Sequence, residues 1–119
     1  MAKAVAQVMG LTLLRPGSNE VRWRDGLAVI KSCGPGTSSF GVTVKMLPRI
    51  DAILAAFEAE TGRVEVFELP TAAFRAAMYD SRSSGAAGRV KMVSRTFAKT
   101  RGVSIAHFSR DELEAAGRD

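Results

Sequence analysis

The sequence predicts a single α/β or α+β domain in which a central mixed β-sheet is flanked by short helices. Three observations predict it. The 119 residues match the usual size of one domain, about 100–150 residues. The hydrophobic fraction of 46% and the charged fraction of 24% are typical of a globular protein. Short segments of alternating hydrophobicity are interspersed with short helical patterns. We find no internal repeat and no interdomain linker, so one domain spans residues 1–119.

The first third of the chain predicts a helix followed by a β-hairpin. Apolar residues recur at helical spacing over residues 2–9, and Gly10 ends the pattern. Residues 21–24 then alternate apolar and charged side chains, Asp25-Gly26 is a strong two-residue turn signal, and residues 27–31 continue as the second strand. With this turn, Glu20 lies opposite Lys31 on one face of the hairpin, and Trp23 and Ile30 lie on the buried face.

The middle of the chain predicts two further strands. Residues 33–39 are a loop of small polar residues, and residues 42–47 are ambiguous because Pro48 limits any helix there. The continuous apolar run at 52–57 is suited to a strand buried on both faces. Residues 63–69 alternate, which predicts the next strand.

The last third predicts alternating short helices and strands around a loop. In order, these are a helix with Thr71 as N-cap, a loop at 80–88, a strand at 90–93, a turn capped by Ser94, a strand at 103–108, and a helix opened by the capping box Ser109–Glu112.

Composition excludes several classes of protein. No apolar run approaches the ~18 residues that span a bilayer. The N-terminal segment lacks the charged, apolar and small-residue regions of a signal peptide. The single Cys33 excludes an intramolecular disulfide framework, and one cysteine with one histidine does not make a usual zinc site. We therefore expect a small cytoplasmic domain.

Positive charge gathers in one segment. The net charge is +5, and between Ser81 and Arg110 there is no acid. That segment holds Arg82, Arg89, Lys91, Arg95, Lys99, Arg101 and Arg110. The first six are the predicted nucleic-acid contacts, because clustered guanidinium groups suit phosphate oxygens. Few aromatic residues are near for base stacking, so duplex DNA is the expected partner. A solvated basic face without a nucleic-acid partner is the alternative.

The order of helix, hairpin ending in a strand lysine, apolar strand, second strand and helix resembles the PD-(D/E)XK nuclease superfamily. Glu20 or Asp25 matches the first acid of its motif, and Val29-Ile30-Lys31 matches the acid-x-Lys. The resemblance implies phosphodiester hydrolysis that depends on Mg²⁺, with Glu20 and Asp25 as metal ligands and with Lys31 and Glu20 as catalytic residues.

One position departs from that pattern, since Val29 stands where the second acid belongs and a valine does not ligate metal. Either Glu20, Asp25, Asp51 or Glu58 supplies the missing carboxylate, or the fold binds without cleaving. Three functions therefore stay open: a nuclease-like protein that acts on DNA, a non-catalytic basic module that binds nucleic acid or another partner, and a small structural or oligomerising domain. Self-association also stays open.

Overall fold

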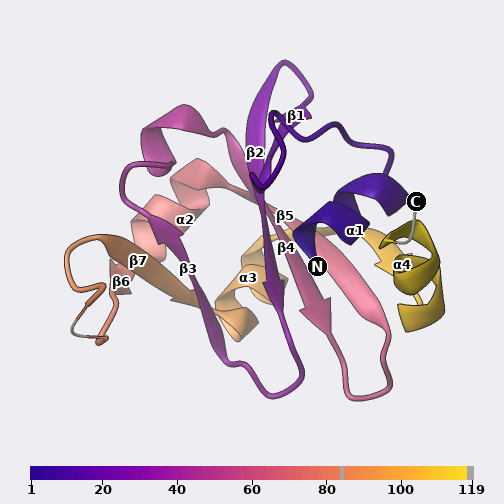
Figure 1. The fold of residues 1–119 in the computed structure, drawn as a ribbon. Coiled ribbons are helices and arrows are strands. Elements are labelled where there is room, and N and C mark those ends of the chain that lie inside the picture. The colour runs from indigo at the N-terminus through magenta and orange to yellow at the C-terminus, as the bar shows by residue number, and fades with distance from the viewer. Residues whose placement is uncertain (84, 118–119) are drawn as a thin grey trace.

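The computed structural model describes residues 1–83 and 85–117, and Figure 1 shows the fold. The helices are α1 (Ala2–Val8), α2 (Thr71–Ala77), α3 (Arg95–Arg101) and α4 (Arg110–Gly117), with a 3₁₀ turn η1 at Leu47–Arg49. The strands are β1 (Glu20–Trp23), β2 (Gly26–Cys33), β3 (Ser39–Thr43), β4 (Ala52–Glu58), β5 (Val64–Pro70), β6 (Tyr79–Asp80), β7 (Val90–Ser94) and β8 (Val103–Phe108).

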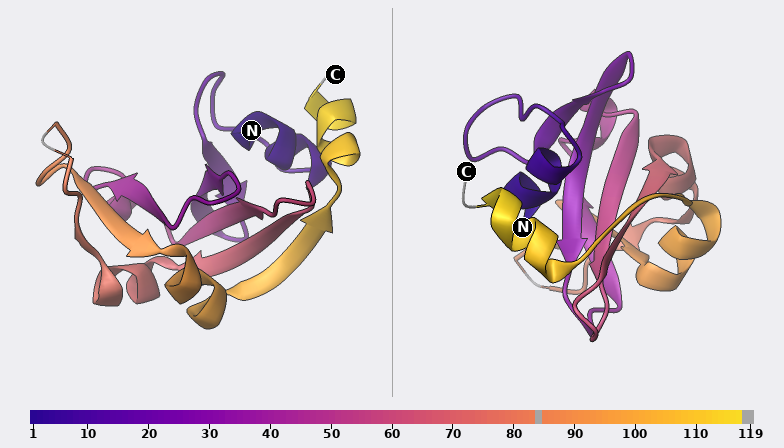
Figure 2. Two further views of the ribbon diagram at one scale, coloured as in Figure 1. Left: turned by 90° about the horizontal axis from the view of Figure 1, so that it is seen from below. Right: turned by 90° about the vertical axis from the view of Figure 1, so that its right-hand side faces the viewer.

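Two sheets organise the molecule. The larger is mixed, with strand order β1-β2-β4-β5-β8, and the smaller is antiparallel, with order β3-β7-β6. Only the β2–β4 pair of the larger sheet is parallel, and β3 with η1 forms the crossover between these two strands. In Figure 2, α1 and α4 cover one face of the larger sheet, while α2 and α3 lie on the other side. The predicted single α+β domain is confirmed.

Each face of the larger sheet has its own hydrophobic core. Val5 of α1 and Leu113 of α4 pack with Ile30 and Val66 on one face. The core of the other face is built from strand residues and from side chains of the small sheet and the α2–α3 side, among them Phe40, Phe57, Phe74, Val93 and Ala98. All seven residues of β4 are buried. The continuous apolar run at 52–57 therefore forms the central strand that we predicted.

The hairpin forms, but its turn lies one residue earlier than predicted. Trp23 pairs with Gly26, and Glu20 pairs with Val29 rather than with Lys31. The turn residues are thus Arg24 and Asp25, and Arg24 has a left-handed φ of 52°. Gly26 is the first residue of β2, and the strand requires glycine at this position because a Cβ there would lie 1.6 Å from the Asp51 side chain. The predicted faces survive, since a shift of two residues in the partner preserves strand alternation.

The remaining elements agree with prediction except in detail. Ser94 acts as a cap, since its Oγ accepts a hydrogen bond from the Phe97 amide at 3.0 Å, but the segment that it caps is the helix α3 rather than the predicted turn. The capping box of α4 is also present, with bonds of 3.1 Å in both directions between Ser109 and Glu112. Thr71 is not the N-cap of α2: that position is Pro70, and Thr71 is the first helical residue.

The start of the predicted loop at 80–88 joins the small sheet. Tyr79 and Asp80 form β6, which pairs with β7. The ambiguous segment at 42–47 begins as the end of β3 and leads into η1, where Pro48 stands in a 3₁₀ turn, and β3 already starts at Ser39, the last residue of the predicted loop. Within residues 1–83 and 85–117, no helix is long and apolar enough to cross a membrane.

Candidate functional site

Glu20, a predicted catalytic residue and metal ligand, lies at the base of the hairpin. It is the first residue of β1 and is 1% exposed. Its Oε2 lies 3.1 Å from Arg49 Nη2, and its Oε1 lies 3.9 Å from Arg15 Nη2. Within the described residues Oε2 receives no hydrogen bond of regular geometry. The carboxylate is therefore buried and faces two guanidinium groups, one of which comes from the η1 crossover.

Lys31, the other predicted catalytic residue, shares a face with Glu20. It lies two residues beyond Val29, the partner of Glu20, so the two charged residues are diagonal neighbours on adjacent strands. Burial lowers the pKa of the Lys31 ammonium, and the nearby Cys33 opposes this effect. The ion pairs in the described part of the chain do not join Glu20 to Lys31.

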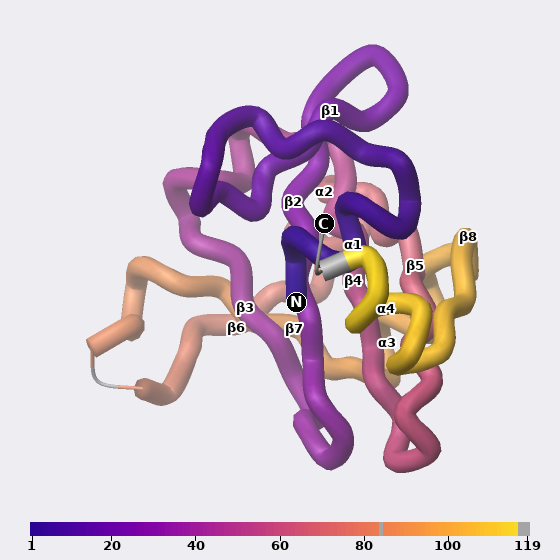
Figure 3. Tube along the Cα trace, turned by 45° about the vertical axis from the view of Figure 1, so that its right-hand side comes forward, coloured from indigo at the N-terminus to yellow at the C-terminus, as the bar shows by residue number. Residues whose placement is uncertain are grey.

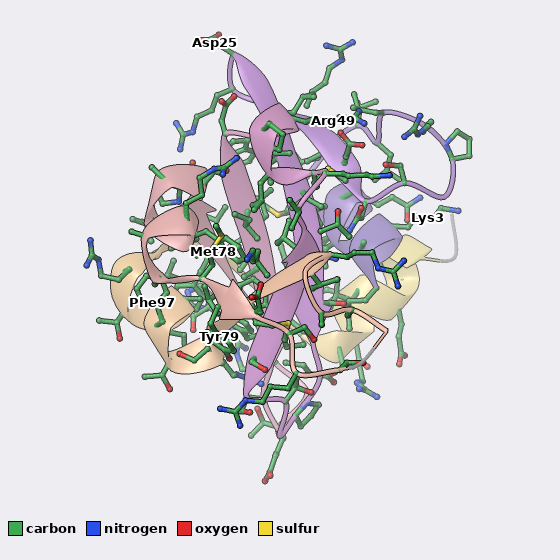
Figure 4. The ribbon with its side chains drawn as sticks, turned by 90° about the vertical axis from the view of Figure 1, so that its left-hand side faces the viewer. Lys3, Asp25, Arg49, Met78, Tyr79 and Phe97 are labelled. Atoms are coloured by element: carbon green, nitrogen blue, oxygen red, sulfur yellow. The ribbon has the colours of Figure 1, made fainter. Side chains whose placement is uncertain are left out.

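The residues present do not fit the predicted Mg²⁺ site. Asp25 lies in the exposed turn at the tip of the hairpin, as Figure 4 shows, five positions along the chain from Glu20. The strand part of that stretch, from Glu20 to Trp23, alone spans about 10 Å. Over residues 1–83 and 85–117, no group of three His, Cys, Asp or Glu side chains is placed to hold a metal ion. Glu20 already faces two arginines, so we derive no catalytic step through a metal.

The two other candidate acids do not complete the site. Glu58 is at the far end of β4, where it pairs with Arg110. Asp51 lines a shallow depression at the hairpin tip together with Asp25 and Glu68.

The depression at the hairpin tip is held together by its own ion pair. Arg24 Nε and Nη2 donate to Glu68 at 3.2 and 2.9 Å, and Trp23 Nε1 donates to the same carboxylate at 2.9 Å. The bond from Arg24 is the largest cause of a lowered pKa at Glu68, and burial opposes it. These contacts fix the turn and the left-handed Arg24, which is a structural role.

The predicted nucleic-acid contacts follow one run of chain from the loop through β7 to α3. Arg82 and Arg89 lie in the loop between β6 and β7. Lys91 lies on β7 and pairs with Asp80 of β6. The remaining three predicted contacts are all on α3: Arg95, Lys99 and Arg101. In Figure 2 the loop stands out at one end of the molecule, and α3 lies beneath the larger sheet.

Arg95 is anchored by backbone groups. Its Nη1 donates to the carbonyls of Gly34 and Thr37 at 3.0 and 3.2 Å, and its Nη2 donates to the carbonyl of Glu58 at 2.7 Å. The guanidinium also lies 5.0 Å from the centroid of the Phe57 ring. Arg95 thus ties the small-residue loop and the end of β4 to α3, while no described ion pair neutralises its charge.

A depression of about 220 Å³ lies beside Arg95. Lys99 lines it one helical turn away, with its Nζ 5.9 Å from the Phe57 centroid. Arg63 and His107 complete the basic lining. Sequence patterns do not identify these two residues, because Arg63, just before β5, meets His107 on β8 only when these strands pair, and no local pattern encodes that pairing.

Comparisons with known proteins assign no family to the chain. A scan against protein-family models and a search of curated proteins both find no match. The resemblance to PD-(D/E)XK nucleases therefore stays a prediction, and the charge and geometry of the site are the basis for inferring a function.

Proposed function

We propose that this protein binds nucleic acid, and duplex DNA in particular, through phosphate contacts from the loop before β7 and from α3. One observation carries the proposal. Of the seven basic residues from Arg82 to Arg110, only Lys91 and Arg110 form ion pairs with carboxylates in the described part of the chain. The other five are Arg82, Arg89, Arg95, Lys99 and Arg101. Cations without a carboxylate partner are free to neutralise phosphates and to release the counterions of DNA.

Hydrolysis of the bound strand is the second candidate function. The observation that favours it is the shared face of Glu20 and Lys31, with the Glu20 carboxylate 1% exposed and its Oε2 without a regular hydrogen bond. Binding comes first because Glu20 faces Arg49 and Arg15, and because the other acids lie elsewhere. A purely structural or oligomerising domain would account for Arg95, which is bonded to three carbonyls, but would leave the other four cations without a role.

Salt dependence tests the binding. Fluorescence anisotropy with a 20-base-pair duplex gives the affinity at several KCl concentrations. If five phosphates are contacted, the affinity falls roughly 500-fold between 50 and 200 mM salt, from a slope of about −0.9 per phosphate. Absence of binding at the lowest salt, or an affinity that ignores salt, would remove the proposal.

The same duplex tests hydrolysis when Mg²⁺ is added. We expect binding without cleavage, with a gel of the end-labelled duplex as readout. If cleavage occurs, if EDTA stops it, and if Glu20→Gln and Lys31→Ala each abolish it while binding persists, then hydrolysis is the function. Cleavage that survives both substitutions would place the active site elsewhere.

A further inference from the structure

The depression beneath α3 holds more positive than negative charge. Arg63, Arg95 and Lys99 line it or lie at its wall, and Glu65 is the carboxylate among its lining residues. Glu65 Oε2 already accepts a hydrogen bond from Ser104 Oγ at 2.6 Å and lies 3.8 Å from His107 Nε2. The lining thus carries an excess of at least two positive charges without counting His107.

The cations are partly preorganised. Arg95 is fixed by its three carbonyl bonds, and Lys99 is one turn further along the same helix. Arg63 precedes β5 directly, and His107 lies on β8 opposite Glu65. Groups held by regular elements lose little conformational entropy when a ligand binds. The buried Phe57 ring lies 5.0 Å from the Arg95 guanidinium and 5.9 Å from Lys99 Nζ, so one wall of the site is apolar.

We propose that this depression binds a phosphate group, with Arg63, Lys99 and His107 as ligand-binding residues and Arg95 as the fixed cation behind them. Guanidinium and ammonium groups around a small hollow favour a compact oxyanion such as phosphate over an apolar ligand. The inference rests on the proposed function when the phosphate belongs to nucleic acid. That phosphate is either an internal phosphodiester, which presents two non-bridging oxygens, or a terminal monoester, which presents three and carries more negative charge.

His107 provides a direct test, because it is the single histidine of the chain and its imidazole C–H signals in a proton NMR spectrum are unambiguous. Inorganic phosphate is titrated at constant pH, with NaCl of matched ionic strength as the salt control. We expect a saturable shift of the His107 signals with phosphate only. A shift that does not saturate, or that NaCl reproduces, would overturn the inference.

Substitutions sharpen the test. Arg63→Ala combined with Lys99→Ala should raise the dissociation constant for phosphate at least about tenfold, which corresponds to one or two charge-assisted hydrogen bonds. Both residues are exposed, so the midpoint of thermal unfolding should stay the same as in the wild type. Arg22→Ala is the matched control, because Arg22 is exposed on β1, at the opposite edge of the sheet from β8. Equal phosphate affinity in the double variant and the wild type would count against the site.

Duplexes with and without a 5′-phosphate separate the two sources. If the site takes a terminal monoester, the wild type prefers the phosphorylated duplex and the double variant loses that preference. If it takes an internal phosphodiester, the double variant loses affinity for both duplexes equally. If the wild type shows no saturable phosphate shift but still binds duplexes with the expected salt dependence, the site is refuted and the proposed function stands. Saturable phosphate binding without duplex binding would support the site and refute the proposed function.

Discussion

Charge serves opposite purposes at the hairpin base and on the α3 side of the molecule. At the hairpin base, the Glu20 carboxylate is buried and two arginines converge on it. Along α3, Lys99 and Arg101 are exposed, and no ion pair of the described residues includes them. Charge that is neutralised by a partner mostly stabilises the fold, whereas charge without a carboxylate partner on the surface is available to a ligand. The sequence motif and the charge cluster thus point to different places, and the charge cluster carries the proposed function.

The largest effect that we expect is on stability at the hairpin base. Arg49→Ala leaves the Glu20 carboxylate buried with Arg15 at 3.9 Å as its remaining partner. A buried charge that loses its partner costs about 3 kcal/mol of unfolding free energy. Urea denaturation measures the loss.

Glu20→Gln is the matched control, and it should cost less, about 1 kcal/mol, because the Arg49 side chain is half exposed and can turn to water. Equal losses of unfolding free energy for the two variants would contradict the explanation that the Glu20–Arg49 ion pair stabilises this region.

On the α3 side, substitutions should change binding and leave stability almost untouched. Replacing Arg82, Lys99 and Arg101 together by alanine should weaken duplex binding at least about 100-fold near 100 mM salt and lower the salt slope by about three. The free energy of unfolding should stay within about 0.5 kcal/mol, since these side chains are exposed. If the triple variant bound DNA like the wild type, these exposed cations would not be the DNA contacts that we propose.

Arg95 both stabilises the fold and carries a charge available to DNA, so its substitution should lower both stability and DNA affinity. Arg95→Ala removes three bonds to the carbonyls of Gly34, Thr37 and Glu58. We expect a loss of about 2 kcal/mol in unfolding free energy, because charged donors hold these carbonyls, together with weaker DNA binding. Urea denaturation and anisotropy on the same preparation measure the two effects, and Lys99→Ala serves as the control that changes binding alone.

A smaller effect concerns alkaline pH. Since burial holds the pKa of Lys31 below its ordinary value of 10.5, this group favours folding above that value, and the contribution is lost as pH falls through the folded-state pKa. The stability of the wild type minus that of Lys31→Met should therefore rise with pH as it approaches 10.5. Thermal unfolding of both proteins at several alkaline pH values gives this difference. A difference that is flat or falls with pH would contradict the cause that we assign.

The smallest effect is at the hairpin tip. The lowered pKa of Glu68, whose main cause is its bond from Arg24, favours folding above the ordinary value of 4.5, and this contribution is lost as pH falls through the folded-state pKa. Because Arg24 is exposed, Glu68→Gln should cost only a few tenths of a kcal/mol. Trp23, the single tryptophan, reports the acid titration by its fluorescence, and the variant should lack that transition. If Glu68→Gln shows the same fluorescence transition as the wild type, the transition arises from another acid.

Much of the fold could be predicted because local signals dominate it. The capping box at Ser109, the cap at Ser94 and the continuous apolar run at 52–57 each depend on neighbours in sequence, and each is present. The hairpin turn could not be placed because its position depends on Asp51 and Glu68, which approach from β4 and β5. A turn signal in the sequence carries no information about those distant side chains.

The candidate site was only half predictable for the same reason. Lys99 and Arg95 are four residues apart on one helix and stand out as a charge cluster. Arg63 and His107 are isolated in sequence, and the pairing of β5 with β8 brings them close to each other beside that helix. Likewise, the burial of Glu20 depends on η1, which supplies Arg49 from a segment with no clear pattern.

The packing of α1 beside α4 has a consequence for how the chain folds during synthesis. The tube in Figure 3 shows these helices, from the two ends of the chain, side by side, and both contribute to one core. On the ribosome, the hairpin and α1 are made early. The apolar face that they share with β4 and β5 is fully covered only after β8 and α4, residues 103–117, have been made. The part of this face that Phe108 and Leu113 cover therefore stays exposed until these residues are made, and exposed apolar surface is what chaperones bind during folding.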